Sequence, residues 1–221
     1  MSLSKFNKAQ VWFETLRDQL IESLQAIDSS KFKVSKWNHK DEGGGKMSVL
    51  KGSVIEKGGV NVSTVGGKFN NEIVNKFPGT EQNSSYKATG ISVVLHPTSP
   101  HIPSMHFNTR FLQTQKEWFG GGIDITPCLL FDNKKNYHNS LRAVCDKFDK
   151  KYYPKFKTWC DDYFFLKHRN EPRGIGGIFF DYLNTDDWEQ DFEFVIAVGQ
   201  FFMKFSIETI SSLKEKKWNN F

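Results

Sequence analysis

The sequence predicts an α+β protein built around an antiparallel sheet. Short strand-like segments, separated by glycine and proline turns, occupy the middle of the chain, and helix-like periodicity precedes and follows them. Runs of strands bounded by helices favour an antiparallel sheet over alternating parallel units. The 221 residues contain no internal repeat and no low-complexity linker, so we expect one domain over residues 1–221.

The first part of the chain predicts one helix and then several short strands. Between Ser4 and Asp28, apolar residues recur at steps of three and four residues, as on one face of a helix. These apolar positions are Phe13, Leu16, Leu20, Leu24 and Ile27. From Lys31 to about Gly67, glycine clusters separate short strands, and residues 70–85 form a polar connection.

The rest of the chain predicts longer strands interrupted by helices. We expect strands at 86–96, 104–114 and 117–131, helices at 132–149 and 151–168, a strand at 173–183, and a helix at 186–217. The last helix begins with aspartates and ends with lysines, which suits the helix dipole. Glycines inside the third strand, Gly120 to Gly122, indicate a bulge or a close approach by a ligand.

Composition narrows the class of protein. A formal net charge of +5 favours an anionic partner, but no nucleic-acid motif is present. The three cysteines, Cys128, Cys145 and Cys160, have no CxxC spacing, so we expect buried thiols and a cytoplasmic protein rather than a disulfide framework. We find no signal peptide, no apolar run long enough for a membrane span, and no motif for NAD, flavin or an iron–sulfur cluster.

Strand alternation predicts a polar face on the strand at 104–114. His106, Asn108 and Arg110 point to one side, and the side chains between them point to the other, largely apolar side. Such a row is either a plain surface or a functional cluster, in which a guanidinium suits a carboxylate or phosphate. Ser92 and His96 share one face of the preceding strand.

Asp124 follows the three glycines by two residues. The glycines would let a flat ligand approach the backbone, with the carboxylate beside it. The alternative is a capping or turn aspartate in a bulge. The histidines leave two readings open as well: separate hydrogen-bonded side chains, or a divalent-metal site built from His96, His106, His138 and His168.

Several long segments resemble the oxygen-dependent coproporphyrinogen III oxidases. They are ATGISVVLHP (88–97), PSMHFNTR (103–110), WFGGGIDITP (118–127), YYPKFKTWCD (152–161) and LKHRNEPRGIGGIFFD (166–181). The resemblance implies a large, flat antiparallel sheet flanked by helices on both faces, a deep substrate cleft and a homodimer. It implies oxidative decarboxylation of the ring A and B propionates of coproporphyrinogen III to vinyls. Dioxygen is the co-substrate, protoporphyrinogen IX is the product, and no organic cofactor is needed.

The resemblance also implies roles for individual residues. His106 matches a proton donor, Asp124 matches the carboxylate that faces the pyrrole N–H groups, and Arg110 matches a substrate contact. Our hypothesis is that Arg110 grips a propionate. Ser92, Asn108 and Thr109 match further substrate contacts. The four histidines at 96, 106, 138 and 168 match a set sometimes described as divalent-metal ligands.

One departure from the family leads to alternative predictions. The resemblance ends near Leu213, and the family's C-terminal segment, which carries a further substrate contact and supports dimerisation, is not found in these 221 residues. We therefore expect a C-terminally shortened member of the family. The alternative function is an inactive tetrapyrrole-binding remnant. A metal-dependent oxygenase built on the four histidines and a basic nucleic-acid binder are further alternatives.

Overall fold

The protein, a computed structural model in which residues 3–70, 72, 74 and 76–218 are described, has an α+β fold. The strands of its large sheet are β1 (Lys33–Asn38), β2 (Glu42–Leu50), β3 (Ile55–Lys68), β4 (Ser85–Pro97), β5 (Ser104–Gln113), β6 (Glu117–Thr126) and β9 (Gly176–Leu183). The helices are α1 (Lys5–Asp28), α2 (Lys134–Asp146), α3 (Tyr152–Tyr163) and α4 (Trp188–Leu213). A small hairpin is formed by β7 (Phe165–Leu166) and β8 (Glu171–Pro172).

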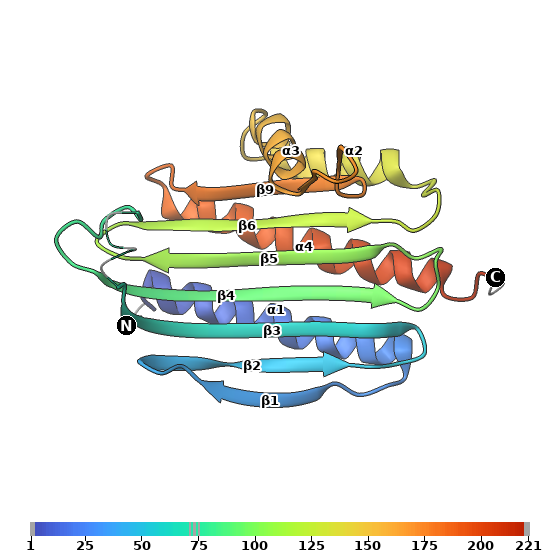
Figure 1. Ribbon diagram of the computed structural model, residues 1–221, viewed down its shortest axis with the longest axis horizontal. Coiled ribbons are helices and arrows are strands. Elements are labelled where there is room, and N and C mark those ends of the chain that lie inside the picture. The colour runs from blue at the N-terminus through green and yellow to red at the C-terminus, as the bar shows by residue number, and fades with distance from the viewer. Residues whose placement is uncertain (1–2, 71, 73, 75, 219–221) are drawn as a thin grey trace.

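The seven strands of the sheet are antiparallel throughout and follow the order β1-β2-β3-β4-β5-β6-β9 (Figure 1). The predicted class is thus confirmed, and every predicted element of residues 86–217 has a counterpart. Two expected elements were too long. The strand expected over 117–131 ends at Thr126, because Pro127 cannot donate to the ladder. The helix expected over 151–168 ends at Tyr163, where the chain turns into the β7–β8 hairpin.

Helix α1 begins and ends where local chemistry dictates. The Ser4 hydroxyl accepts a hydrogen bond from the Asn7 amide at 3.2 Å, and Ser29 closes the helix with φ 65°. The Asp28 carboxylate accepts hydrogen bonds from the backbone N–H groups of residues 53–55. Burial alone would raise the pKa of Asp28, but a hydrogen bond from Ser30 and these backbone bonds lower it overall. The carboxylate thereby ties the end of α1 to the β2–β3 loop.

Helices α1 and α4 cover one face of the sheet. Alternate residues of β4, β5 and β6 point into this core, where Phe107 of β5 stacks on Phe202 of α4 with ring centroids 4.8 Å apart. The opposite face of β4 is exposed, with Val94 38% accessible. We call this second side the open face.

The expected helices on both faces are found only in part. Figure 1 shows α1 and α4 behind the sheet, and α2 and α3 at its β9 edge. Helix α3 lies against the β9 edge and contacts both faces of the sheet. Its Phe156 contacts Phe180 on the core side, and its Trp159 contacts Phe179 on the open side. No helix among the described residues covers the open face of β3 to β5.

Helix α4 is apolar enough to resemble a membrane span. By length and composition alone, it is the one helix of the described residues that could cross a bilayer, with a mean hydropathy of 1.3 over its best window. Half of that window is buried inside the fold, where Phe194, Phe202 and Ile210 are fully inaccessible. This burial is what a core helix of a globular domain shows.

The three cysteines are free, and their burial differs from the prediction at one position. Cys145 and Cys160 are buried, and burial raises the pKa of each thiol to about 12. Cys128 is exposed, so the prediction of three buried thiols is wrong there, because Cys128 lies beyond the end of β6 in the loop that leads to α2.

Candidate active site

Polar side chains of four neighbouring strands meet on the open face. The register places Ser92 of β4 opposite Asn108 of β5, and His106 of β5 opposite Asp124 of β6. Arg110 lies opposite Gly120, so its side chain extends over a strand position that carries no side chain. Asp124 and Arg110 are therefore on the same side of the sheet, separated by four residues or about 13 Å along the strands.

The Asp124 carboxylate is nearly removed from water, with only 3% of its side chain exposed. It accepts two hydrogen bonds from Arg173, from Nε at 3.0 Å and from Nη2 at 2.8 Å. The Nδ1 atom of His106 lies 3.5 Å from its Oδ1 atom. A bidentate guanidinium supplies a desolvated carboxylate with hydrogen bonds and with a compensating charge.

Arg173 was not among the residues that the sequence analysis selected. It lies 49 residues from Asp124, and strand alternation says nothing about a residue in the turn that precedes β9. Its guanidinium also stacks on the Phe164 ring at 3.9 Å, which attaches the end of α3 to the site. The contact depends on the pairing of β6 with β9, which brings Gly177 opposite Asp124, and local sequence patterns do not predict such a pairing.

A second ion pair lies further along the same face. The Nη2 atom of Arg110 donates to Oδ2 of Asp181, on β9, at 2.6 Å. The Arg110 side chain is 37% exposed and that of Asp181 is 19% exposed. The open face therefore carries two arginine–aspartate pairs. The stretch of β6 that separates them includes Gly120 and Gly122, which have no side chains.

The four histidines do not form one group. His96 and His106 meet with their Nε2 atoms 3.2 Å apart, whereas His138 bonds to the Tyr153 hydroxyl at 2.9 Å and His168 lies in the β7–β8 hairpin. No set of three or more His, Cys, Asp or Glu within the described part of the chain is placed to hold a metal ion. The predicted four-histidine ligand set therefore does not fit the arrangement of these side chains.

Burial controls the charge of two of these histidines. Desolvation lowers the pKa of His96, and the neighbouring His106 and Lys57 lower it further. Desolvation likewise lowers the pKa of His138, together with the charges of Lys157 and Lys134. Neutral imidazole is thus favoured at both positions near pH 7.

Thr109 lies on the wrong side of the sheet for a ligand contact. Thr109 is 1% exposed, and its hydroxyl is buried on the core side without a hydrogen-bond partner among the described residues. Alternation along β5 requires this, because Asn108 and Arg110 occupy the open face. A contact between the Thr109 hydroxyl and a ligand on the open face is therefore not supported.

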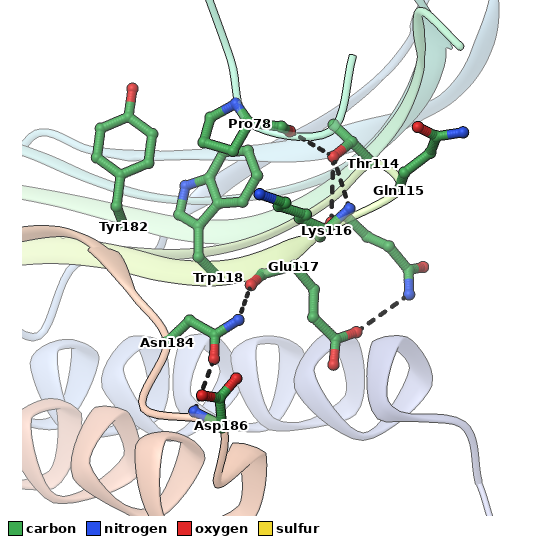
Figure 2. Close-up of a pocket in the computed structure, with 10 residues that line it drawn as sticks. Pro78, Thr114, Gln115, Lys116, Glu117, Trp118, Tyr182, Asn184 and Asp186 are labelled. Atoms are coloured by element: carbon green, nitrogen blue, oxygen red, sulfur yellow. Dashed lines mark hydrogen bonds between the residues drawn. The ribbon is translucent and has the colours of Figure 1, made fainter. Parts of the chain in front are cut away.

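The deep substrate cleft that the resemblance implies stays a prediction. Five well-formed hollows of the described structure are lined by other residues. One of about 590 Å³ lies at the opposite end of β6, beside Trp118 and the β5–β6 turn (Figure 2). There Tyr182 stacks on Trp118 with ring centroids 5.4 Å apart. The site is bordered on the β9 side by Phe164, at the end of α3, whose ring lies 3.9 Å from the Arg173 guanidinium.

Comparison with known proteins agrees with the resemblance. The sequence profile of the family described as coproporphyrinogen III oxidase matches residues 8–221. A protein of Rickettsia rickettsii (strain Sheila Smith), named oxygen-dependent coproporphyrinogen-III oxidase, is 48% identical over 94% of this chain and 78% of its own length. Proteins of the same name from Rickettsia akari and Rickettsia bellii (strain OSU 85-389) are 46% and 49% identical, over 94% and 86% of this chain and 78% and 72% of their own lengths. A match of this extent, together with a buried carboxylate, an imidazole and two guanidinium groups on one sheet face, shows that the chain belongs to the coproporphyrinogen III oxidase family.

Proposed function

We propose that this protein converts the ring A and B propionates of coproporphyrinogen III to vinyl groups, with dioxygen as the oxidant. The observation that carries the proposal is the Asp124 carboxylate, 3% exposed and paired with the Arg173 guanidinium on the open face of the sheet. The family membership and the names of the relatives support the same chemistry.

Asp124 is the group that we assign to the centre of the tetrapyrrole. A porphyrinogen presents four pyrrole N–H donors at its centre, and a carboxylate has about four lone-pair positions, of which Arg173 uses two. The remaining positions can accept pyrrole N–H bonds and favour loss of a pyrrole proton. A carboxylate out of water interacts more strongly with these donors than a hydrated one does.

Arg110 and His106 take the two other roles. The Arg110 guanidinium, on the same face and about 13 Å along the strands from Asp124, suits a propionate at the rim of the macrocycle. His106 lies next to Asp124, with its Nδ1 atom 3.5 Å from Oδ1, and we assign it the role of proton donor. Ser92 and Asn108 lie side by side between these groups as further polar contacts.

The overall reaction is balanced without an organic cofactor. Each propionate loses its carboxylate as carbon dioxide and a hydride equivalent from the carbon next to the ring, which leaves the vinyl group. Dioxygen accepts the two electrons and, with protons, becomes hydrogen peroxide. The cycle occurs twice for each molecule of product. Because two of the three thiols are buried and none is paired, we further infer a reducing, cytoplasmic location, and we expect a homodimer as in the rest of the family.

The test is turnover of anaerobically prepared coproporphyrinogen III after admission of air, measured as protoporphyrin fluorescence once the product is oxidised. We expect turnover by the wild type and none by Asp124→Asn. Asp191→Asn is the matched control, because Asp191 is also buried (3% exposed) and accepts two hydrogen bonds from Thr185. Unlike Asp124, it lies in the first turn of α4, on the core side of the sheet. Substantial activity of Asp124→Asn would reject its role, and binding without any protoporphyrin would favour the tetrapyrrole-binding remnant.

A further inference from the structure

We infer that Asp181 is a positioning residue, which holds the Arg110 guanidinium in place to receive a substrate carboxylate. The inference rests on the proposed function and extends it to a residue that contacts Arg110 rather than the substrate. It follows from the contacts of Asp181, from the glycine that these contacts require, and from an unusual backbone conformation beside it.

The ion pair between Arg110 and Asp181 crosses a strand. Arg110 is on β5 and Asp181 is on β9, with β6 between them, and Gly120 of β6 lies directly opposite Arg110. A Cβ atom on Gly120 would lie 2.5 Å from Oδ1 of Asp181 and 3.0 Å from Cζ of Arg110. A side chain at this position would force Asp181 or Arg110 to move, whereas glycine leaves their 2.6 Å bond undisturbed.

Alternation along β9 places Asp181 where Arg110 can reach it, and a bulge follows directly. The register between β6 and β9 shifts between Phe119 and Gly121, so β9 has one more residue than β6 at this point. Asp181 lies on the open face because the preceding Phe180 is fully buried in the core, and the extra residue lets Leu183 (7% exposed) return to the core while Tyr182 stays exposed. Tyr182, the next residue, adopts φ 53°, a left-handed conformation that residues other than glycine rarely take.

The strained conformation at Tyr182 has an identifiable effect on Asp181. The Tyr182 backbone N–H donates to Oδ1 of Asp181 at 2.9 Å, while Oδ2 remains for Arg110. The Tyr182 ring stacks on Trp118, beside the hollow drawn in Figure 2, and this contact holds the turn. Backbone strain of this kind persists where the surrounding structure enforces it, and it often marks a functional position.

Asp181 orients Arg110 and leaves most of the guanidinium N–H donors available for a ligand. The carboxylate accepts one hydrogen bond from a guanidinium that has five N–H donors, and the Arg110 side chain remains 37% exposed on the open face. The remaining donors can still bind a propionate in the bidentate geometry that arginine favours. Without Asp181, the flexible Arg110 side chain would have to be ordered by the substrate itself, which lowers affinity.

The test is a double-mutant cycle on Arg110 and Asp181. KM and kcat are measured for coproporphyrinogen III, and Kd is measured for its stable oxidised form, coproporphyrin III, by fluorescence. We expect Asp181→Ala to raise KM and Kd about tenfold, Asp181→Asn to raise them less, and kcat to change by no more than about twofold. Because Asp181 acts through Arg110, the variant with both residues replaced by alanine should bind no more weakly than Arg110→Ala alone.

The control is Glu117→Gln, which removes another paired carboxylate, 23% exposed, from the core side of β6. It should leave KM and Kd unchanged. Additive losses at Arg110 and Asp181, or a change confined to the melting temperature, would overturn the inference. If Asp181→Ala does not fold, Asp181→Asn decides the same cycle. A wild type that binds coproporphyrin III but shows no turnover refutes the proposed function alone, because the Kd cycle still tests Asp181.

Discussion

Removing either member of the Arg173–Asp124 pair should destabilise the protein, but by unequal amounts. The Asp124 side chain is 3% exposed, so it cannot regain water when Arg173 is replaced by Met, and two charged hydrogen bonds are lost. We expect a loss of about 3 kcal/mol in the free energy of unfolding. The Arg173 side chain is 29% exposed and can be partly hydrated, so Asp124→Asn should cost only about 1–2 kcal/mol.

The measurement is urea unfolding at pH 7, followed by tryptophan fluorescence, for the wild type, both single variants and the double variant. The double variant should resemble Asp124→Asn, which corresponds to a coupling energy of about 3 kcal/mol between the two side chains. In thermal unfolding, Arg173→Met should lower Tm by about 6–12 °C for a chain of this length.

Two results would refute the reasoning on this pair. If the two single losses add in the double variant, the side chains do not depend on each other. If Arg173→Met costs no more than Asp124→Asn, the carboxylate is not the desolvated partner. The second result would also weaken the proposed mechanism, in which Asp124 must be charged and shielded from water.

Four further changes test the fold around the site. Ser29→Gly should raise stability by about 0.5–1 kcal/mol in thermal unfolding, because glycine adopts φ 65° without strain; a loss would contradict this. Asp28→Asn should cost about 2 kcal/mol at pH 7. Since the folded-state pKa of Asp28 is lowered, its contribution is present above about pH 4 and disappears as the pH falls, so the variant should show a shallower acid transition. The lowered pKa of His96 means that the unfolded chain binds more protons, so stability should fall below about pH 6.5, and His96→Gln should reduce this slope in pH-dependent urea unfolding. Gly121→Ala should cost about 2 kcal/mol or more, because its Cβ would lie 2.5 Å from a backbone oxygen of β5, whereas Gly59→Ala, with its nearest neighbour at 3.5 Å, should be nearly neutral in the same assay.

Local patterns were sufficient to predict most elements and one face of the site. Three- and four-residue periodicity identified α1 to within a residue, and two-residue alternation placed Ser92, Asn108 and Arg110 on one side of their strands. Alternation also separated Thr109 from these residues, and the structure places its side chain in the core as the alternation requires. The resemblance alone had suggested a contact between Thr109 and the substrate.

Pairing between distant segments could not be predicted in this way. The Arg173–Asp124 and Arg110–Asp181 pairs join residues 49 and 71 positions apart, and both depend on β9 entering the sheet next to β6. The same holds for the histidines: spacing left a four-histidine metal site open, whereas the fold brings together only His96 and His106.

The sequence by itself determined the class of fold, the family, and which side chains share a face of a strand, since these depend on periodicity and on contiguous motifs. The tertiary structure alone decided which charges meet and which face stays open. The physical reason is that burial and ion pairing depend on the order of the strands and on their register. Asp124 is a shielded, paired carboxylate only because β9 and the chain before it close over one end of β6.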